Sequence, residues 1–349
     1  MPRTRWGLGW LALLVWGVLA VTAPAVRAQQ MGGGGGGGES LLDSDEATTE
    51  LGAPKQKRPG WLFHRTAYDT VQEQMAYAER LLAKGKRRKA GKALNALVHR
   101  WHNTPEAARA QRLYAESLQH RRKSEKAFDE YQYLVHYFAG TFPYQDVLQT
   151  QFQLANDVRT ARHGRLFVLP GFQDPGRAVP LYEQIVANGP NWDRAPEAQF
   201  NAGVIQEATG EPELAVVSYE TLLLRYPRSD FVEEAAYRRA HALYALSRKS
   251  PRDEAQCREA LSAMLAFARN YPADPHREDA RRLAEELKNH LADMYYDRAL
   301  YYDRIAKRPQ SAIIAYSDYI SKFPTSERRN VADQRVAALQ LQLEENHEK

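Results

Sequence analysis

The sequence predicts an all-α repeat protein built from antiparallel helical hairpins. At four places an alanine precedes a proline by twelve residues: Ala178 and Pro190, Ala215 and Pro227, Ala260 and Pro272, Ala312 and Pro324. Large residues follow each alanine at the fourth and seventh positions: Tyr182 and Ile185, Tyr219 and Leu222, Met264 and Phe267, Tyr316 and Tyr319. Because small and large apolar residues recur at helical spacing before a helix-ending proline, one helical unit is repeated along the chain.

Small residues upstream of these helices predict a second helix in each unit. Ala202 and Gly203 lie in one apolar stretch, Gly210 follows at a turn, and Ala215 lies in the next helix. Small residues let two antiparallel helices approach closely, whereas larger side chains would separate them. Similar sets recur at Ala78, Gly85 and Ala90, and at Ala115 and Ala127. The pattern is that of the tetratricopeptide repeat, a helix-turn-helix of about 34 residues.

We therefore expect a right-handed tetratricopeptide superhelix of about thirteen helices, occupying residues 61–349. The third unit is interrupted at residues 162–175, where the apolar run 166–171 is expected to fold back on the array. A final amphipathic helix over residues 326–343 is expected to cap it. The six predicted units are residues 65–102, 105–142, 144–190, 193–227, 230–272 and 277–324.

The first sixty residues predict an export signal and a linker. Residues 1–28 combine Arg3 and Arg5 with a 16-residue apolar run, shorter than the roughly 20 residues that a membrane-spanning helix needs, and end in small residues suited to cleavage. Residues 29–60 contain seven consecutive glycines and an acidic stretch, which favours a disordered spacer. We expect an exported protein of the periplasm, with Cys257 on a helix surface or half-buried.

Positive charge is concentrated in the first two units. The whole chain carries +5, and thirteen Lys or Arg but only three acids lie between Lys84 and Lys126. The run from Lys84 to Lys92 falls at a predicted inter-helix turn. Such runs suggest nucleic acid, but an exported protein rarely meets it, so we expect contact with an anionic membrane surface or an acidic partner instead.

Residues 61–343 resemble the BamD-type outer-membrane assembly proteins. The resemblance rests on the export signal, the spacer, and repeats ending in Tyr226-Pro227-Arg228-Ser229, Tyr271-Pro272 and Phe323-Pro324-Thr325-Ser326. It implies a periplasmic scaffold that helps assemble β-barrel proteins into the outer membrane. It also implies two partners, the C-terminal segments of unfolded outer-membrane proteins and a BamA-like assembly protein that docks at about residues 273–343.

Two features depart from that family. Its members are lipoproteins with a cysteine at the mature N-terminus and usually have five repeats, whereas Cys257 is the single cysteine here and six units are predicted. We therefore expect no N-terminal lipid anchor. A weaker resemblance to CpoB-like coordinators of envelope constriction remains an alternative, although no long heptad segment precedes the repeats. A third functional alternative is that the solenoid belongs to an enzyme that acts on peptidoglycan.

The candidate binding residues lie on the first helix of each unit, which lines the concave groove of such solenoids. Arg109 and Arg112 share one helix face, and guanidinium groups suit the carboxylates of a bound peptide. The remaining candidates are apolar or aromatic partner contacts: Met75, Phe200, Tyr237 and Tyr244.

No pattern predicts catalysis. The ten histidines are scattered, and the chain contains no zinc motif, GxSxG, phosphate-binding loop or dinucleotide-binding turn. We expect no enzyme activity, no cofactor and no metal.

Overall fold

The computed structural model describes residues 54–59, 64–163 and 172–347. The chain divides into residues 1–51 and 52–349, and the thirteen α-helices of the described residues all belong to the second unit. The predicted export signal lies outside the described residues, and so does the predicted linker up to residue 53.

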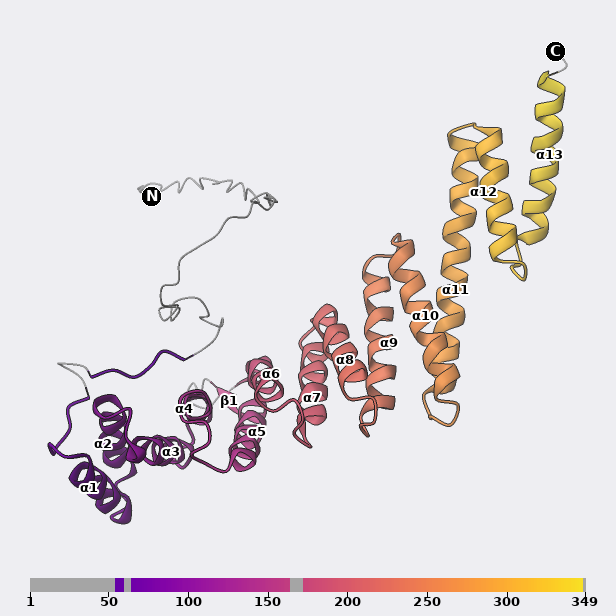
Figure 1. Cartoon of the computed structure of the whole chain (residues 1–349). Coiled ribbons are helices and arrows are strands. Elements are labelled where there is room, and N and C mark those ends of the chain that lie inside the picture. The colour runs from indigo at the N-terminus through magenta and orange to yellow at the C-terminus, as the bar shows by residue number, and fades with distance from the viewer. Residues whose placement is uncertain (1–53, 60–63, 164–171, 348–349) are drawn as a thin grey trace, which may run out of the picture. The chain divides into compact units, whose positions relative to one another are not determined.

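Six helical hairpins and a final helix follow one another along the chain, each helix packing antiparallel on the next (Figure 1). The first three hairpins are α1 (Val71–Ala83) with α2 (Arg87–Arg100), α3 (Pro105–Gln119) with α4 (Ser124–Tyr137), and α5 (Tyr144–Thr160) with α6 (Val179–Asn188). The next three are α7 (Ala195–Ala208) with α8 (Pro212–Arg225), α9 (Val232–Lys249) with α10 (Glu254–Asn270), and α11 (Arg277–Leu300) with α12 (Pro309–Lys322). The array ends with α13 (Arg329–His347).

The third hairpin is interrupted, as predicted. Two short antiparallel strands, β1 (Arg162–His163) and β2 (Phe172–Gln173), and a 3-10 turn, Pro175–Ala178, separate α5 from α6. The apolar run that was expected to fold back on the array, residues 166–171, lies outside the described residues. The first helix of the sixth unit is long, because α11 spans 24 residues and continues into a π-helical turn, Tyr301–Ile305.

The repeated apolar positions form the core. Ala178, Ala215, Ala260 and Ala312 have no exposed surface, and the large residues that follow them are equally buried: Tyr182, Tyr219, Met264 and Tyr316. Cys257 is also buried, and its thiol lies 3.7 Å from the Leu287 carbonyl oxygen of α11. The expectation that this thiol lies at the surface or half-buried is wrong, because α10 turns that face toward α11. The all-α tetratricopeptide solenoid is confirmed.

A buried glutamine ties the two helices of several units together. Gln74 donates through its side-chain amide to the Ala93 carbonyl oxygen at 2.9 Å, and Gln199 donates to that of Ser218 at 3.0 Å. Gln111 makes the same bond to Glu130 at 2.7 Å. In each case donor and acceptor are 19 residues apart. Each bond satisfies a polar group that would otherwise be costly to bury.

Candidate functional site: a docked N-terminal segment

Residues 54–59 lie against the face where α2, α3 and α4 meet. Helix α3 contributes Gln111 and Tyr114 to this face, and α4 contributes Glu130, Tyr133 and Tyr137. The three α4 residues are spaced i, i+3 and i+7, so they share one side of that helix. The two helices thus place the hydrogen-bond acceptors of Gln111 and Glu130 among the aromatic rings of the three tyrosines.

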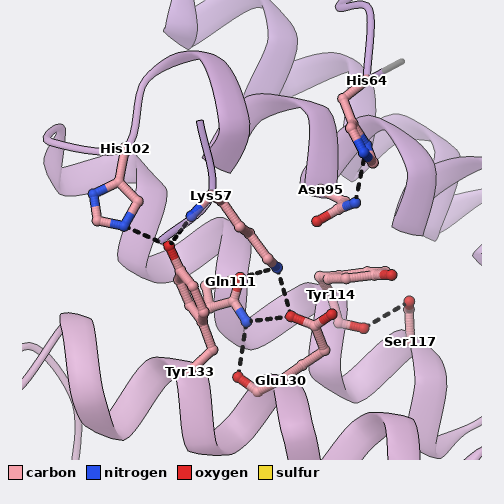
Figure 2. A network of polar contacts seen from close by, with 9 residues as sticks. All are labelled: Lys57, His64, Asn95, His102, Gln111, Tyr114, Ser117, Glu130 and Tyr133. Carbon is pink, nitrogen blue, oxygen red and sulfur yellow. Dashed lines mark hydrogen bonds and ion pairs between the residues drawn. The ribbon is translucent and has the colours of Figure 1, made fainter. Parts of the chain in front are cut away.

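Lys57 is the anchor of the docked segment. Its Nζ lies 2.5 Å from Glu130 Oε2 and 2.9 Å from Gln111 Oε1. The ammonium also lies 4.7 Å from the ring centre of Tyr133 and 5.0 Å from that of Tyr114. Figure 2 shows the lysine side chain passing between the two tyrosines toward Gln111 and Glu130. Only 11% of the Lys57 side chain is exposed, so this cation is withdrawn from water and compensated by a carboxylate, an amide and two rings.

Gln111 is positioned for this role by the inter-helix bond described above. Its side-chain nitrogen donates to the Glu130 carbonyl oxygen at 2.7 Å and to Glu130 Oε2 at 2.8 Å. The amide oxygen is then left to accept from Lys57. In the first unit, the oxygen of Gln74 accepts instead from the backbone nitrogen of Ala67 at 2.9 Å. The same repeat position therefore holds a preceding chain segment in both units.

The backbone of the segment is held by side chains as well. The Lys57 N–H donates to the Tyr133 hydroxyl at 2.9 Å, and the Tyr137 hydroxyl donates to the Pro54 carbonyl oxygen at 2.6 Å. The Tyr133 hydroxyl also lies 2.7 Å from Nε2 of His102, to which it can donate while accepting from Lys57. At the other end, Nδ1 of His99 lies 2.8 Å from the Arg58 carbonyl oxygen. These bonds do not depend on the side chains of the segment, so the face also binds its backbone.

Burial dominates the electrostatics of the site. It lowers the pKa of the Lys57 ammonium, although the adjacent Glu130 carboxylate acts in the opposite direction. It raises the pKa of Tyr133 to about 12, so this phenol remains protonated at physiological pH. Burial also lowers the pKa of His99, with the bond to Arg58 opposing the shift. The neutral His99 ring is therefore favoured.

The lowered pKa of Lys57 makes docking pH-dependent. Between that pKa and the ordinary value of 10.5 the docked lysine binds fewer protons than the released lysine. Docking should therefore strengthen as the pH rises through this interval. We expect an NMR titration of the Lys57 side chain to have its midpoint below 10.5. A midpoint at or above that value would contradict the burial of the ammonium.

The docked segment revises the predicted linker. Residues 54–59 fall within the disordered spacer that the glycine run and the acidic stretch predict over residues 29–60. In the structure they are packed on α2, α3 and α4, because the Lys57 side chain and the backbone of the segment form hydrogen bonds with residues of these helices. The folded part of the chain therefore begins before the predicted boundary at residue 61.

Arg109 and Arg112 lie on a different side of the second unit. Arg109 forms an ion pair with Glu79 of α1 at 2.7 Å, and Arg112 pairs with Glu116 at 3.1 Å. The Arg109 side chain is 69% exposed and that of Arg112 is 49% exposed. Both arginines are thus available on the α1–α3 side, away from the docked segment.

The other candidate residues are engaged in packing. Met75 is 6% exposed, so its assignment to a partner surface is wrong: it shares the core face of α1 with Ala78. Phe200 stacks on Phe231 with ring centres 5.1 Å apart. The hydroxyls of the two α9 tyrosines donate to acids of α11: Tyr237 to Asp279 at 2.9 Å and Tyr244 to Glu286 at 2.7 Å. A partner-binding role for Phe200, Tyr237 and Tyr244 stays a prediction.

Sequence reasoning missed the docked segment and its receptor residues. Two features of the sequence could have indicated this face. A glutamine recurs on the first helix of a unit, and the second helix of the second unit carries aromatic residues at i and i+4.

Within the described ranges, no group of three or more His, Cys, Asp or Glu is arranged to hold a metal ion, and no helix is both long and apolar enough to cross a membrane.

Two protein families match parts of the chain. Residues 176–349 match the YfiO family, described as outer membrane lipoprotein, and residues 76–143 match a tetratricopeptide-repeat family. The chain is a BamD-like tetratricopeptide-repeat protein. The YfiO match begins within the 3-10 turn before α6 and continues through α13, so it covers α6, the last three hairpins and the final helix. No curated protein matches the chain.

Several solved repeat proteins are similar to this BamD-like chain. One is a tetratricopeptide repeat protein from Parabacteroides merdae, with 12% identity over 77% of this chain and 98% of that one, and a TM-score of 0.26. Another is the C-terminal part of a repeat protein from Cytophaga hutchinsonii, with 15% identity over 76% and 88%, and a TM-score of 0.27. A kinesin light chain-like repeat protein from Podosopora anserina has 20% identity over 64% and 95%, and a TM-score of 0.23.

Proposed function

We propose that this BamD-like protein is a periplasmic scaffold that holds unfolded outer-membrane protein segments and docks a BamA-like partner during β-barrel assembly. The match of residues 176–349 to a family of outer membrane lipoproteins carries the proposal. The repeat fold supports the scaffold role, because stacked hairpins present extended surfaces to partners.

The first two units supply a surface for an acidic or carboxylate-bearing peptide. Arg109 and Arg112 are exposed on the α1–α3 side, where each is paired with a half-buried glutamate. Surface ion pairs of this kind contribute about 0–1 kcal/mol, so a bound carboxylate can replace the glutamate at little cost. The opposite side of these units already holds residues 54–59. The arginine-bearing side is therefore the better surface for an external peptide.

The later units present apolar side chains suited to a folded partner. On α8, Leu214, Val217 and Leu224 are exposed, and Leu265 on α10 and Ile314 on α12 are exposed too. All five lie on the second helices of consecutive units. Exposed apolar side chains are available there for contact with a partner. They support docking of a BamA-like protein on the part of the chain that matches the family.

The peptide surface is tested by reversing its charge. The double variant Arg109→Glu/Arg112→Glu should bind C-terminal peptides of outer-membrane proteins about tenfold more weakly, because charge-assisted bonds to the peptide carboxylates are lost. Fluorescence anisotropy with labelled peptides would measure this. The matched control is Arg87→Glu/Lys89→Glu, which makes the same charge change at two exposed residues of α2. Equal binding by the wild type and the Arg109/Arg112 variant would refute this surface.

A further inference from the structure

A cavity rich in positive charge lies beside the docked segment. It has a volume of about 590 Å³ and is bounded by the loop before α1, by α2, by the end of α3 and by the start of α4. Six cationic side chains line it: Arg65, Arg88, Lys92, Arg121, Lys123 and Lys126. No carboxylate is among its lining residues.

None of the six cations has an ion-pair partner in the described part of the chain. Lys126 is close enough to Asp129 to affect the pKa of that acid, but no salt bridge joins them. Gathering six like charges around one concavity is unfavourable in the absence of counter-charge. The arrangement is therefore suited to a ligand that brings negative charge.

A second cavity also contains several cationic side chains, but most of them are paired with acids. It lies between α10 and α11, has a volume of about 790 Å³ and is lined by four arginines. Three of these pair with glutamates: Arg258 with Glu254, and both Arg277 and Arg281 with Glu278. Most of the charge at that cavity is therefore compensated within the protein. The cavity of the first two units lacks such compensation.

The lining chemistry identifies the class of ligand. Arginine forms bidentate bonds to phosphate oxygens, and lysine contributes point charges at the same anion. Asn95, His64 and Tyr114 add polar groups, and Leu118 is the one aliphatic residue of the lining. Figure 2 shows the Asn95 amide directed at the His64 ring, with a bond of 3.2 Å. Such a lining suits a polar, multiply charged group better than an acyl chain.

We propose that this cavity binds a ligand carrying more than one phosphate group. A volume of about 590 Å³ lies within the range of roughly 300–1,000 Å³ typical of small-ligand sites. The shared chemistry admits two sources, a phosphorylated headgroup at a membrane surface and a soluble phosphorylated molecule. The site is independent of the scaffold function proposed above, because it uses neither Arg109 nor Arg112.

The structure also separates cavity residues from their basic neighbours. Of the run from Lys84 to Lys92, only Arg88 and Lys92 line the cavity, one helical turn apart on α2. Arg87 and Lys89 lie on the same helix, are exposed and are not among the lining residues. These pairs have equal charge and differ in the direction in which they project. They form a matched test and control.

The experiment uses isothermal titration of the full chain with inorganic tripolyphosphate. The variant Arg88→Gln/Lys92→Gln should bind about tenfold more weakly than the wild type, because two charge-assisted contacts are removed. The control Arg87→Gln/Lys89→Gln should stay within about threefold, since it alters only the diffuse field. Thermal unfolding of both variants checks that they remain folded. Equal losses in the two variants, or no binding by the wild type, would overturn the proposal.

Vesicles distinguish the two sources. Phosphatidylcholine vesicles containing cardiolipin, which carries two phosphates, should bind the wild type and be displaced by tripolyphosphate if the ligand is a headgroup. Binding of tripolyphosphate without binding of these vesicles would support a soluble ligand. Tighter binding of a single-stranded oligonucleotide than of either probe would contradict the proposal, because the cavity would then be part of a nucleic-acid surface.

Discussion

Replacing Glu130 by alanine is expected to release residues 54–59 from the face formed by α2, α3 and α4. The Lys57 and Glu130 side chains are only 11% and 19% exposed, so the variant would leave an ammonium buried without its counter-charge. Removing one partner of a buried pair typically costs about 3–5 kcal/mol. Because the segment can leave the face while the helices remain folded, the cost should appear as undocking rather than global unfolding. Hydrogen exchange of residues 54–59 would measure it.

The control for this variant is Glu116→Ala. Glu116 also pairs with an arginine, but that pair lies at the surface of α3, with side chains 49% and 36% exposed, and should contribute at most about 1 kcal/mol. Exchange of residues 54–59 should then match the wild type. The double variant Lys57→Met/Glu130→Gln should restore part of the protection, since it removes both charges together. Unchanged exchange in Glu130→Ala would show that Lys57 does not anchor the segment.

Replacing Gly203 by alanine is expected to destabilise the fourth unit. A Cβ at this position of α7 would lie 2.6 Å from Cε1 of Tyr219, with two further ring atoms within 3.0 Å. The Tyr219 ring has no exposed surface, and its hydroxyl is held by Glu207 at 3.0 Å, so the ring cannot move aside freely. Overpacking of this kind costs about 1–3 kcal/mol, and the higher helix propensity of alanine returns at most about 1 kcal/mol. The midpoint of urea denaturation should fall.

Gly176→Ala is the matched control for Gly203→Ala. A Cβ on Gly176 would meet its nearest neighbour, Asp174, at 3.5 Å, which is an ordinary contact. Its denaturation midpoint should stay close to that of the wild type. The double variant Gly203→Ala/Tyr219→Leu tests the mechanism, because removing the ring should abolish the extra cost of the alanine. A wild-type midpoint for Gly203→Ala alone would mean that α7 and α8 can separate without loss.

Local patterns in the sequence predicted most of the fold. The alanine-to-proline spacing located the second helices of the last four units, and the aromatic residues after each alanine are buried as their helical period requires. Cys257 and Met75 were harder to place, because one step around a helix separates a core position from an exposed one. Their burial depends on the neighbouring helix, which the residues nearby in sequence do not specify.

The candidate site was less accessible to sequence reasoning. Arg109 and Arg112 were found because two arginines at i and i+3 share a face, which is a local property. Lys57 gave no such signal, since its acceptors lie 54 and 73 residues away and its own surroundings resemble a linker. The cavity likewise joins cations from four segments, of which the basic run supplied only Arg88 and Lys92.

The sequence by itself determined the repeated hairpin, its number of copies and the kinship of the last three units with outer membrane lipoproteins. These follow from periodic apolar residues, small contact residues and helix-ending prolines, all of which act within about one repeat. Only the tertiary structure decided which face holds residues 54–59 and which cations surround one cavity. Stacked helices bring side chains from distant parts of the chain together, and the residues near each of them in the sequence do not specify these contacts.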